Sequence, residues 1–180
     1  KRLEGPAVLV TVVEVQGSAP REVGARMLVE PKAQQGTIGG GELEWRALKA
    51  ARRMLVAGRE TPELDAFPLG PALGQCCGGM VRLLFEPLVD MDEIRALAAQ
   101  LEALDKPALL TRRLEDGKRG LVWDEGSHGH VDAALFRAWL EEPGPRIERI
   151  DENDDAVLVE RLPAPRPHVW IFGAGHVGRA

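Results

Sequence analysis

The sequence predicts a mixed α+β domain, of the α/β class, followed by the start of a second domain. Three observations support this. A β-branched run, AVLVTVVEVQ at residues 7–16, is typical of a buried strand. The segment ELEWRALKAARRML at 42–55 has the apolar spacing of a helix. A proline-rich linker at 163–167 then separates residues 1–162 from a short apolar strand at 168–172, because proline disfavours regular structure.

The first half of the chain is expected to hold three strands and one helix. Strands are predicted at 7–16, 25–30 and 80–86, and the first two are expected to pair as a hairpin with a long loop. Residues 61–79 are rich in Pro and Gly and are expected to be mostly loop. The predicted helix places one set of residues inward: Leu43, Ala47, Ala50 and Met54.

A second helix is predicted to begin at Asp90, which forms a capping-box pattern with Glu93. Its expected inward residues are Ile94, Leu97, Ala98, Leu101 and Leu104. Strands at 108–114 and 121–123 are expected to form a hairpin, followed by a short helix at 131–140 and a strand at 156–162. The predicted core tryptophans are Trp45, Trp139 and Trp170.

Composition and charge narrow the classes of partner. The chain has 180 residues and a formal net charge of -5, which would on average repel a nucleic-acid backbone. Its early apolar run is too short to cross a bilayer. The two cysteines are adjacent, so a disulfide between them could not link distant segments of the chain. A secreted domain stabilised by disulfides is therefore excluded. We therefore expect a cytoplasmic protein that binds neither nucleic acid nor membranes.

The pattern Gly173-x-Gly175-x-x-Gly178 follows the strand at 168–172. In a dinucleotide-binding domain, these glycines permit the tight turn, the approach of the pyrophosphate and close packing of the helix. The helix, the next strand and the acidic ribose ligand do not follow within the 180 residues. The pattern predicts the architecture of such a domain more strongly than nucleotide binding by this segment.

A second glycine-rich segment, GTIGGG at 36–41, leads directly into the helix at Glu42. The amides of Gly39, Gly40 and Gly41 would face an anion at a helix N-terminus. The competing interpretation is close packing of strand and helix, and Glu42 and Glu44 favour it because acidic side chains already satisfy the helix dipole. The sequence leaves the two interpretations about even.

The segment GQCCGG at 74–79 places Cys76 and Cys77 beside Gly78 and Gly79. Thiolates are nucleophiles and soft-metal ligands, and a glycine-rich loop is poor core material. We therefore favour a functional thiol over two buried, inert cysteines. His128 and His130 flank a glycine and are interpreted as surface residues rather than metal ligands.

Ser18 and Arg21 lie in the segment GSAPREVG at 17–24. The arginine fork suits a phosphate group, and the serine hydroxyl could donate beside it. On chemistry alone, an ordinary turn with a solvated charge pair explains these residues better.

Four segments in this order resemble the xanthine dehydrogenase accessory protein family, XdhC/CoxI: GSAPREVGARMLV at 17–29, GTIGGGELE at 36–44, LGQCCGG at 73–79 and HVWIFGAGHVGRA at 168–180. The resemblance implies an N-terminal family domain at 1–162 and the start of a Rossmann-like domain at 168–180. It also implies a molybdenum cofactor (molybdopterin) chaperone that is not itself the oxidoreductase.

The resemblance further implies that the protein protects the cofactor, supports its sulfuration with a cysteine desulfurase and delivers it to a xanthine dehydrogenase-like apoenzyme. Carried over by motif, the cofactor-binding residues are Ser18, Arg21, Gly39, Gly40, Gly41, Cys76, Cys77, Gly78 and Gly79, with Cys77 as the molybdenum ligand. A homodimer is left open. The alternatives are an NAD(P)-dependent oxidoreductase and a redox or adaptor module that uses the Cys76–Cys77 pair.

Overall fold

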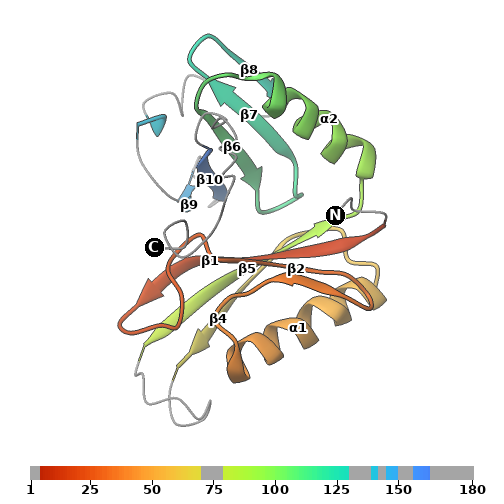
Figure 1. Ribbon diagram of the computed structural model, residues 1–180, viewed down its shortest axis with the longest axis vertical. Helices are drawn as coiled ribbons and strands as arrows, with labels where there is room; N and C mark the ends of the chain where they lie inside the picture. Colours follow the sequence, from red (N-terminus) through yellow and green to blue (C-terminus); the bar gives the residue numbers. More distant parts are fainter. Residues whose placement is uncertain (1–4, 70–78, 130–138, 142–144, 150–155, 163–180) are drawn as a thin grey trace, which may run out of the picture.

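The computed structural model describes residues 5–69, 79–129, 139–141, 145–149 and 156–162. In this part of the chain, two antiparallel sheets of five strands each are accompanied by two helices. Figure 1 shows the first sheet lying between helix α1 on one side and the second sheet on the other. The predicted mixed α/β class is thus confirmed for the described residues, whereas the linker and the second domain lie outside them.

The first sheet has the strand order β3-β2-β1-β5-β4. Its strands are β1 (Ala7–Gln16), β2 (Arg26–Val29), β3 (Gln34–Gly36), β4 (Glu63–Pro68) and β5 (Met80–Leu88). The predicted hairpin of the first two strands is confirmed by antiparallel pairing in which Val8 faces Val29 and Thr11 faces Arg26. β1 is the central strand, as its β-branched composition favours.

Helix α1 (Gly41–Val56) covers one face of this sheet. Leu43, Ala47 and Met54 are buried as predicted, and they share a core cluster with the sheet residues Val10 and Phe85. The fourth buried position is Ala51, whereas the predicted Ala50 is only partly buried at the edge of the cluster.

Trp45 was predicted to lie in the core, and this prediction is wrong. Its exposed fraction is 56%. Trp45 lies two positions after Leu43, so the helical period turns it away from the sheet. Helical geometry therefore overrides the general tendency of tryptophan to be buried.

The segment 61–79 was expected to be mostly loop, but β4 occupies Glu63–Pro68 and pairs with β5. Polar residues and a terminal proline weaken the sequence signal of this strand. They are tolerated because β4 lies at the edge of the sheet, where one side of the strand needs no ladder hydrogen bonds.

The second sheet has the order β8-β7-β6-β10-β9. Its strands are β6 (Ala108–Arg113), β7 (Arg119–Trp123), β8 (Gly126–Gly129), β9 (Pro145–Arg149) and β10 (Ala156–Leu162). The predicted hairpin of β6 and β7 and the predicted strand at 156–162 are confirmed. β3, β8 and β9 are short or polar and were not predicted, because their apolar alternation is too weak.

Helix α2 (Met91–Ala103) begins at the predicted cap. The Asp90 carboxylate accepts hydrogen bonds from the backbone N–H groups of Asp92 and Glu93, at 3.0 and 2.9 Å. The Glu93 side chain instead accepts a bond from Arg119 on β7 at 2.9 Å. Four of the five residues predicted to face inward, Ile94, Leu97, Ala98 and Leu101, line a cavity between α2 and the two sheets. Only Leu97 is fully buried, because the cavity leaves the others partly accessible.

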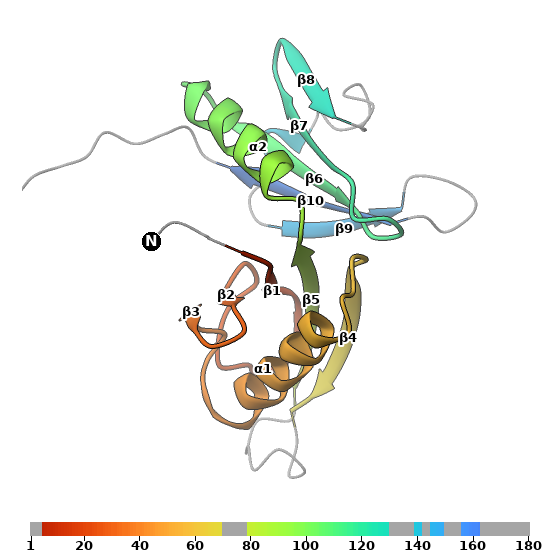
Figure 2. The same cartoon turned by 90° about the vertical axis from the view of Figure 1, so that its right-hand side faces the viewer.

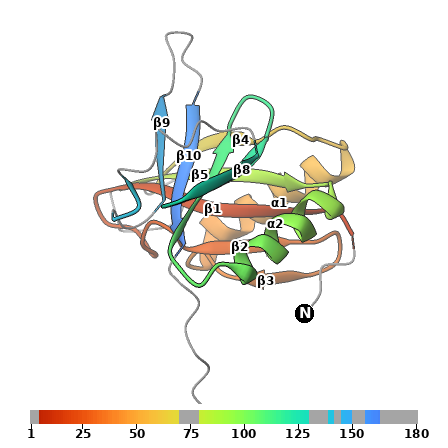
Figure 3. The same cartoon turned by 90° about the horizontal axis from the view of Figure 1, so that it is seen from above.

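The strands of the two sheets run across one another, with a buried layer between them (Figures 2 and 3). Strand alternation sends Val81, Leu83 and Phe85 of β5 toward α1, so that Leu84 and Glu86 face the second sheet. The same alternation turns Leu158 of β10 inward, where it packs with Leu84. The layer between the sheets therefore combines apolar contacts with buried charges.

Those buried charges form one connected group. Arg112 Nε lies 2.8 Å from Glu86 Oε1, and Arg112 Nη2 lies 3.1 Å from Glu160 Oε2. Glu160 also forms an ion pair with Arg26 of β2. Next to this group is a cavity of about 230 Å³ between α2 and the two sheets, lined mainly by leucines and by Glu86, Arg112 and Arg119.

Two further sequence expectations can be placed. Neither α1 nor α2, the two helices in the described ranges, is long and apolar enough to cross a bilayer. The expected helix at 131–140 lies almost wholly outside the described residues, as does Trp170. Trp139 is partly buried against the cluster on the outer face of the second sheet.

Candidate functional site

Three of the sequence motifs meet at one end of the first sheet. β1 ends at Gln16, which is paired with Met80 at the start of β5. β3 ends at Gly36, which is paired with Met27 near the start of β2. The segments that follow β1 and β3 and the residue that precedes β5 therefore leave the sheet on the same side.

Gly79 packs directly against the segment that follows β1. A Cβ atom on Gly79 would lie 2.4 Å from the carbonyl oxygen of Ser18 and 2.6 Å from that of Gln16. These distances are too short for any side chain, so only glycine fits there without backbone movement. The end of the Cys-Gly-Gly motif thus contacts the Ser-Ala-Pro-Arg motif.

Gly39 makes the second contact between motifs. It has a φ of +120°, and an added Cβ atom would lie 2.5 Å from Pro20 Cβ and 3.3 Å from Arg21 Cγ. The glycine is required both by its backbone conformation and by this close approach. The triple-glycine turn is consequently packed on the same segment that Gly79 touches.

The amides of this turn are mostly engaged within the protein. Glu44 Oε2 accepts hydrogen bonds from the backbone N–H groups of Ile38 and Gly40, at 3.0 and 3.1 Å. The Gly39 N–H donates to Thr37 Oγ1 at 3.1 Å, and the Thr37 hydroxyl donates to Glu44. One carboxylate therefore organises the turn, in the manner of the returning side chain of a capping box.

These hydrogen bonds also determine the protonation of Glu44. Partial burial raises the pKa of Glu44, but the bonds from Thr37, Gly40, Ile38 and Gln34 together hold it below its usual value. Glu44 is therefore ionised near neutral pH and places a negative charge at the turn. Gly41 begins α1, and its N–H has no acceptor within the helix.

Arg21 lies at the same end of the sheet and is partly exposed. Its guanidinium forms an ion pair with the neighbouring Glu22 at 3.1 Å, and the hydrogen bond to Glu22 raises the pKa of Arg21. Ser18 is exposed. The Arg21–Glu22 ion pair agrees with the interpretation of this segment as an ordinary solvated turn. Because the pair is exposed, Arg21 could also bind a ligand anion in place of the Glu22 carboxylate.

Several predicted site residues cannot be placed. Cys76, Cys77 and Gly78 lie outside the described residues, as do His130 and the glycines Gly173, Gly175 and Gly178. His128 is exposed on β8. Within the described ranges, no group of three or more His, Cys, Asp or Glu side chains is arranged to hold a metal ion.

Comparison with known proteins adds to this geometry. The family model described as "XdhC and CoxI family" matches residues 2–65, a range that includes the Ser-Ala-Pro-Arg segment and the triple-glycine turn. Over these residues, the chain is similar to the XdhC and CoxI family. The family resemblance predicted from the sequence is thus confirmed. Comparison with curated proteins finds no match.

A similar solved structure supports the fold of this XdhC/CoxI-like chain. It is a crystal structure described as a xanthine dehydrogenase from Bacillus halodurans, with a TM-score of 0.66 and 24% identity. The match covers 89% of this chain and 49% of the other, so this chain spans about half the length of that protein.

The sequence did not predict how Glu44 acts in the XdhC/CoxI-like turn. The sequence indicated only that an acidic side chain at the start of the helix favours close packing. The structure shows that Glu44 accepts hydrogen bonds from the backbone N–H groups of Ile38 and Gly40. The Thr37 hydroxyl also donates to Glu44, so Glu44 engages a side chain of the turn as well as its amides. The spacing of seven residues between them gave no direct indication of the contact.

Proposed function

We propose that this protein is a molybdenum cofactor chaperone. It would bind and protect the cofactor, support its sulfuration with a cysteine desulfurase, and deliver it to a xanthine dehydrogenase-like apoenzyme. The observation that carries the proposal is the meeting of three family motifs at one end of the first sheet, through the contacts of Gly79 with Ser18 and of Gly39 with Pro20. Stable packing of the sheet and helix alone would not require these three motifs to lie next to one another.

The thiol would be supplied by Cys77 of the Cys-Gly-Gly motif. Cys77 precedes Gly79 by two residues in the sequence. A thiolate is a suitable reversible ligand for a soft metal centre. A site made of connecting segments at the end of a sheet also allows the release that a carrier needs.

The phosphate end of the cofactor would need hydrogen-bond donors. Gly39 and Gly40 donate to Thr37 and Glu44, so they fit this role only if those bonds are exchanged. The Gly41 N–H at the start of α1 and the Arg21 guanidinium fit it better. When bound, the cofactor supplies the metal centre for oxidation chemistry in the recipient enzyme. The Rossmann-like domain predicted to begin at residue 168 belongs to the same proposal.

The decisive experiment is elemental analysis of protein purified from molybdate-fed cells, combined with fluorescence detection of the oxidised pterin. We expect molybdenum and pterin to co-purify in a fixed ratio. Cys77→Ala should lose both, and Cys76→Ala provides the matched neighbouring variant. If neither substitution changes the molybdenum or pterin content, the thiols have no part in binding.

A further inference from the structure

The outward side of α1 carries exposed apolar residues that the fold does not use. α1 buries Leu43, Ala47, Ala51 and Met54 against the first sheet. On the opposite side, Trp45 is 56% exposed and Val56 is 90% exposed. Trp45 and Val56 are eleven residues apart, which corresponds to about 16 Å along a helix. We call this surface the α1 face: Trp45, Leu48, Lys49, Arg52, Arg53, Val56 and Ala57.

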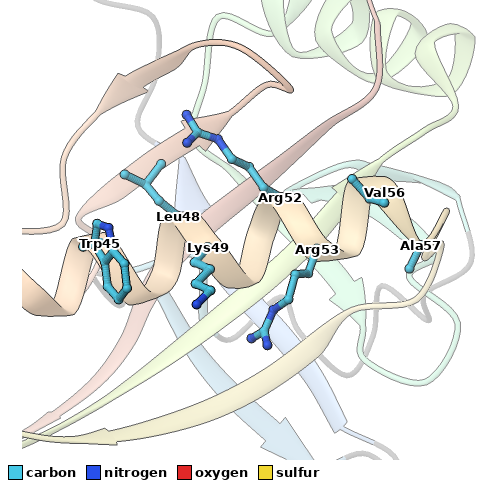
Figure 4. A pocket seen from close by; sticks show the side chains of 7 residues that line it. All are labelled: Trp45, Leu48, Lys49, Arg52, Arg53, Val56 and Ala57. Atoms are coloured by element: carbon cyan, nitrogen blue, oxygen red, sulfur yellow. The ribbon is translucent and has the colours of Figure 1, made fainter.

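Three cations lie between the two apolar ends of the α1 face. In Figure 4, Lys49 and Arg53 project on one side of the helix axis and Arg52 on the other. Lys49 Nζ lies 5.3 Å from the centre of the Trp45 ring, within the range of a cation–π interaction. Arg52 and Arg53 form no ion pair within the described part of the chain, whereas the nearby Arg46 is paired with Glu42 at 2.8 Å.

The charge of the α1 face is opposite to that of the whole protein. The chain has a formal net charge of -5, yet this surface presents three positive side chains and no carboxylate. The same residues border a shallow hollow of about 460 Å³. A solvated helix face explains the cations, but it does not explain the exposed tryptophan and valine beside them, and tryptophan and arginine are the residues most enriched in protein interfaces.

We propose that the α1 face binds an acidic segment of a partner protein. Carboxylates of that segment would lie against Lys49, Arg52 and Arg53, and apolar side chains at its two ends would pack on Trp45 and Val56. A lipid surface fits less well, because membrane-surface helices need a continuous apolar face and here the cations interrupt it. A nucleic acid also fits less well, because its phosphates could meet the cations but it has no aliphatic side chain to pack on Val56. The proposal does not depend on the cofactor role.

The test uses the full chain and a synthetic helical peptide with leucines about eleven residues apart and glutamates between them. A peptide with lysines in place of the glutamates is the control. We expect the acidic peptide alone to bind, with affinity that falls as salt is raised. Binding should also change the tryptophan fluorescence of the protein, and Trp45→Ala should remove that change. Absence of binding by the acidic peptide, or equal binding of both peptides, would overturn the proposal.

Matched variants separate the α1 face from overall charge. Arg52→Glu/Arg53→Glu should weaken peptide binding about tenfold or more, and Trp45→Ala should also weaken it. Lys32→Glu/Arg95→Glu changes the net charge equally, lies elsewhere, and should leave binding nearly unchanged. Binding to phosphatidylserine vesicles without peptide binding would identify a membrane surface instead. Self-association abolished by Arg52→Glu/Arg53→Glu, without peptide binding, would identify a second copy; either result refutes the proposal.

Discussion

Glu86 on β5 and Arg112 on β6 form a buried ion pair that joins the two sheets, with 2.8 Å between Oε1 and Nε. The exposed fractions of their side chains are 1% and 4%. Arg112 also contacts Glu160, and Glu160 contacts Arg26 of the first sheet. The crossing of the sheets is therefore specified by charges as well as by apolar packing.

Removing one partner of this pair should strongly destabilise the protein. Arg112→Met leaves two buried carboxylates less compensated, and we expect it to lower the free energy of unfolding by about 3–5 kcal/mol, measured by urea denaturation. Arg95→Met, which removes an exposed pair with Asp92, should cost less than about 1 kcal/mol. A similar small effect for Arg112→Met would contradict the role assigned to the buried pair.

Stability should also depend on pH through Glu86. Complete burial raises the pKa of Glu86 above its ordinary value of 4.5, against the opposing effect of Arg112, Arg119 and Arg26. Between the ordinary and the raised pKa, the folded state binds more protons than the unfolded state, so the contribution of Glu86 to stability falls as pH rises. The free energy of unfolding of the wild type minus that of Glu86→Gln should therefore decrease as pH rises above 4.5.

Urea denaturation of both proteins at several pH values measures this difference. Other titrating groups contribute almost equally to the two curves, so they cancel in the comparison. A difference that stays constant or increases with pH would show that Glu86 is not held toward its protonated form.

Gly79→Ala tests the contact between the two motifs. The new Cβ atom would meet the carbonyl oxygens of Ser18 and Gln16, so the backbone must shift, and we expect a loss of about 1–3 kcal/mol with a lower Tm. Gly5→Ala is the control, because a Cβ atom there would have no atom within 4 Å. If both variants melt at the same temperature, Gly79 and Ser18 are not in close contact.

Glu44→Ala should destabilise the triple-glycine turn. It removes the acceptor of the Ile38 and Gly40 amides, and we expect a loss of about 1–2 kcal/mol together with faster hydrogen exchange at those two amides. Because the pKa of Glu44 is lowered, this contribution is present above its ordinary pKa and is lost as pH falls through the lowered value.

The control for Glu44→Ala is Glu42→Ala. Among the described residues, Glu42 pairs with Arg46 four residues on in an exposed ion pair, so its removal should cost about 0.5 kcal/mol or less. Unchanged exchange of the Ile38 and Gly40 amides in Glu44→Ala would show that Glu44 does not organise the turn.

Local sequence patterns predicted the long apolar elements well. β1 was predicted with the bounds observed, and α1 and the Asp90 cap of α2 were recognised from spacing alone. β4 was missed because its stability comes from pairing with β5, which its own polar residues do not reveal. The inward face of α2 was recognised for four of its five residues, but the sequence did not show that a cavity would leave all except Leu97 partly accessible.

By itself, the sequence determined which segments form the central strands and the helices, because apolar periodicity and capping act within a few residues. It also provided the glycine motifs and the family resemblance. Only the tertiary structure decided that Gly79 meets Ser18, that Glu44 occupies the turn amides, and that Glu86 meets Arg112. The physical reason is that these contacts join segments far apart in the chain or depend on side-chain direction, and both are fixed only when the sheets and helices pack.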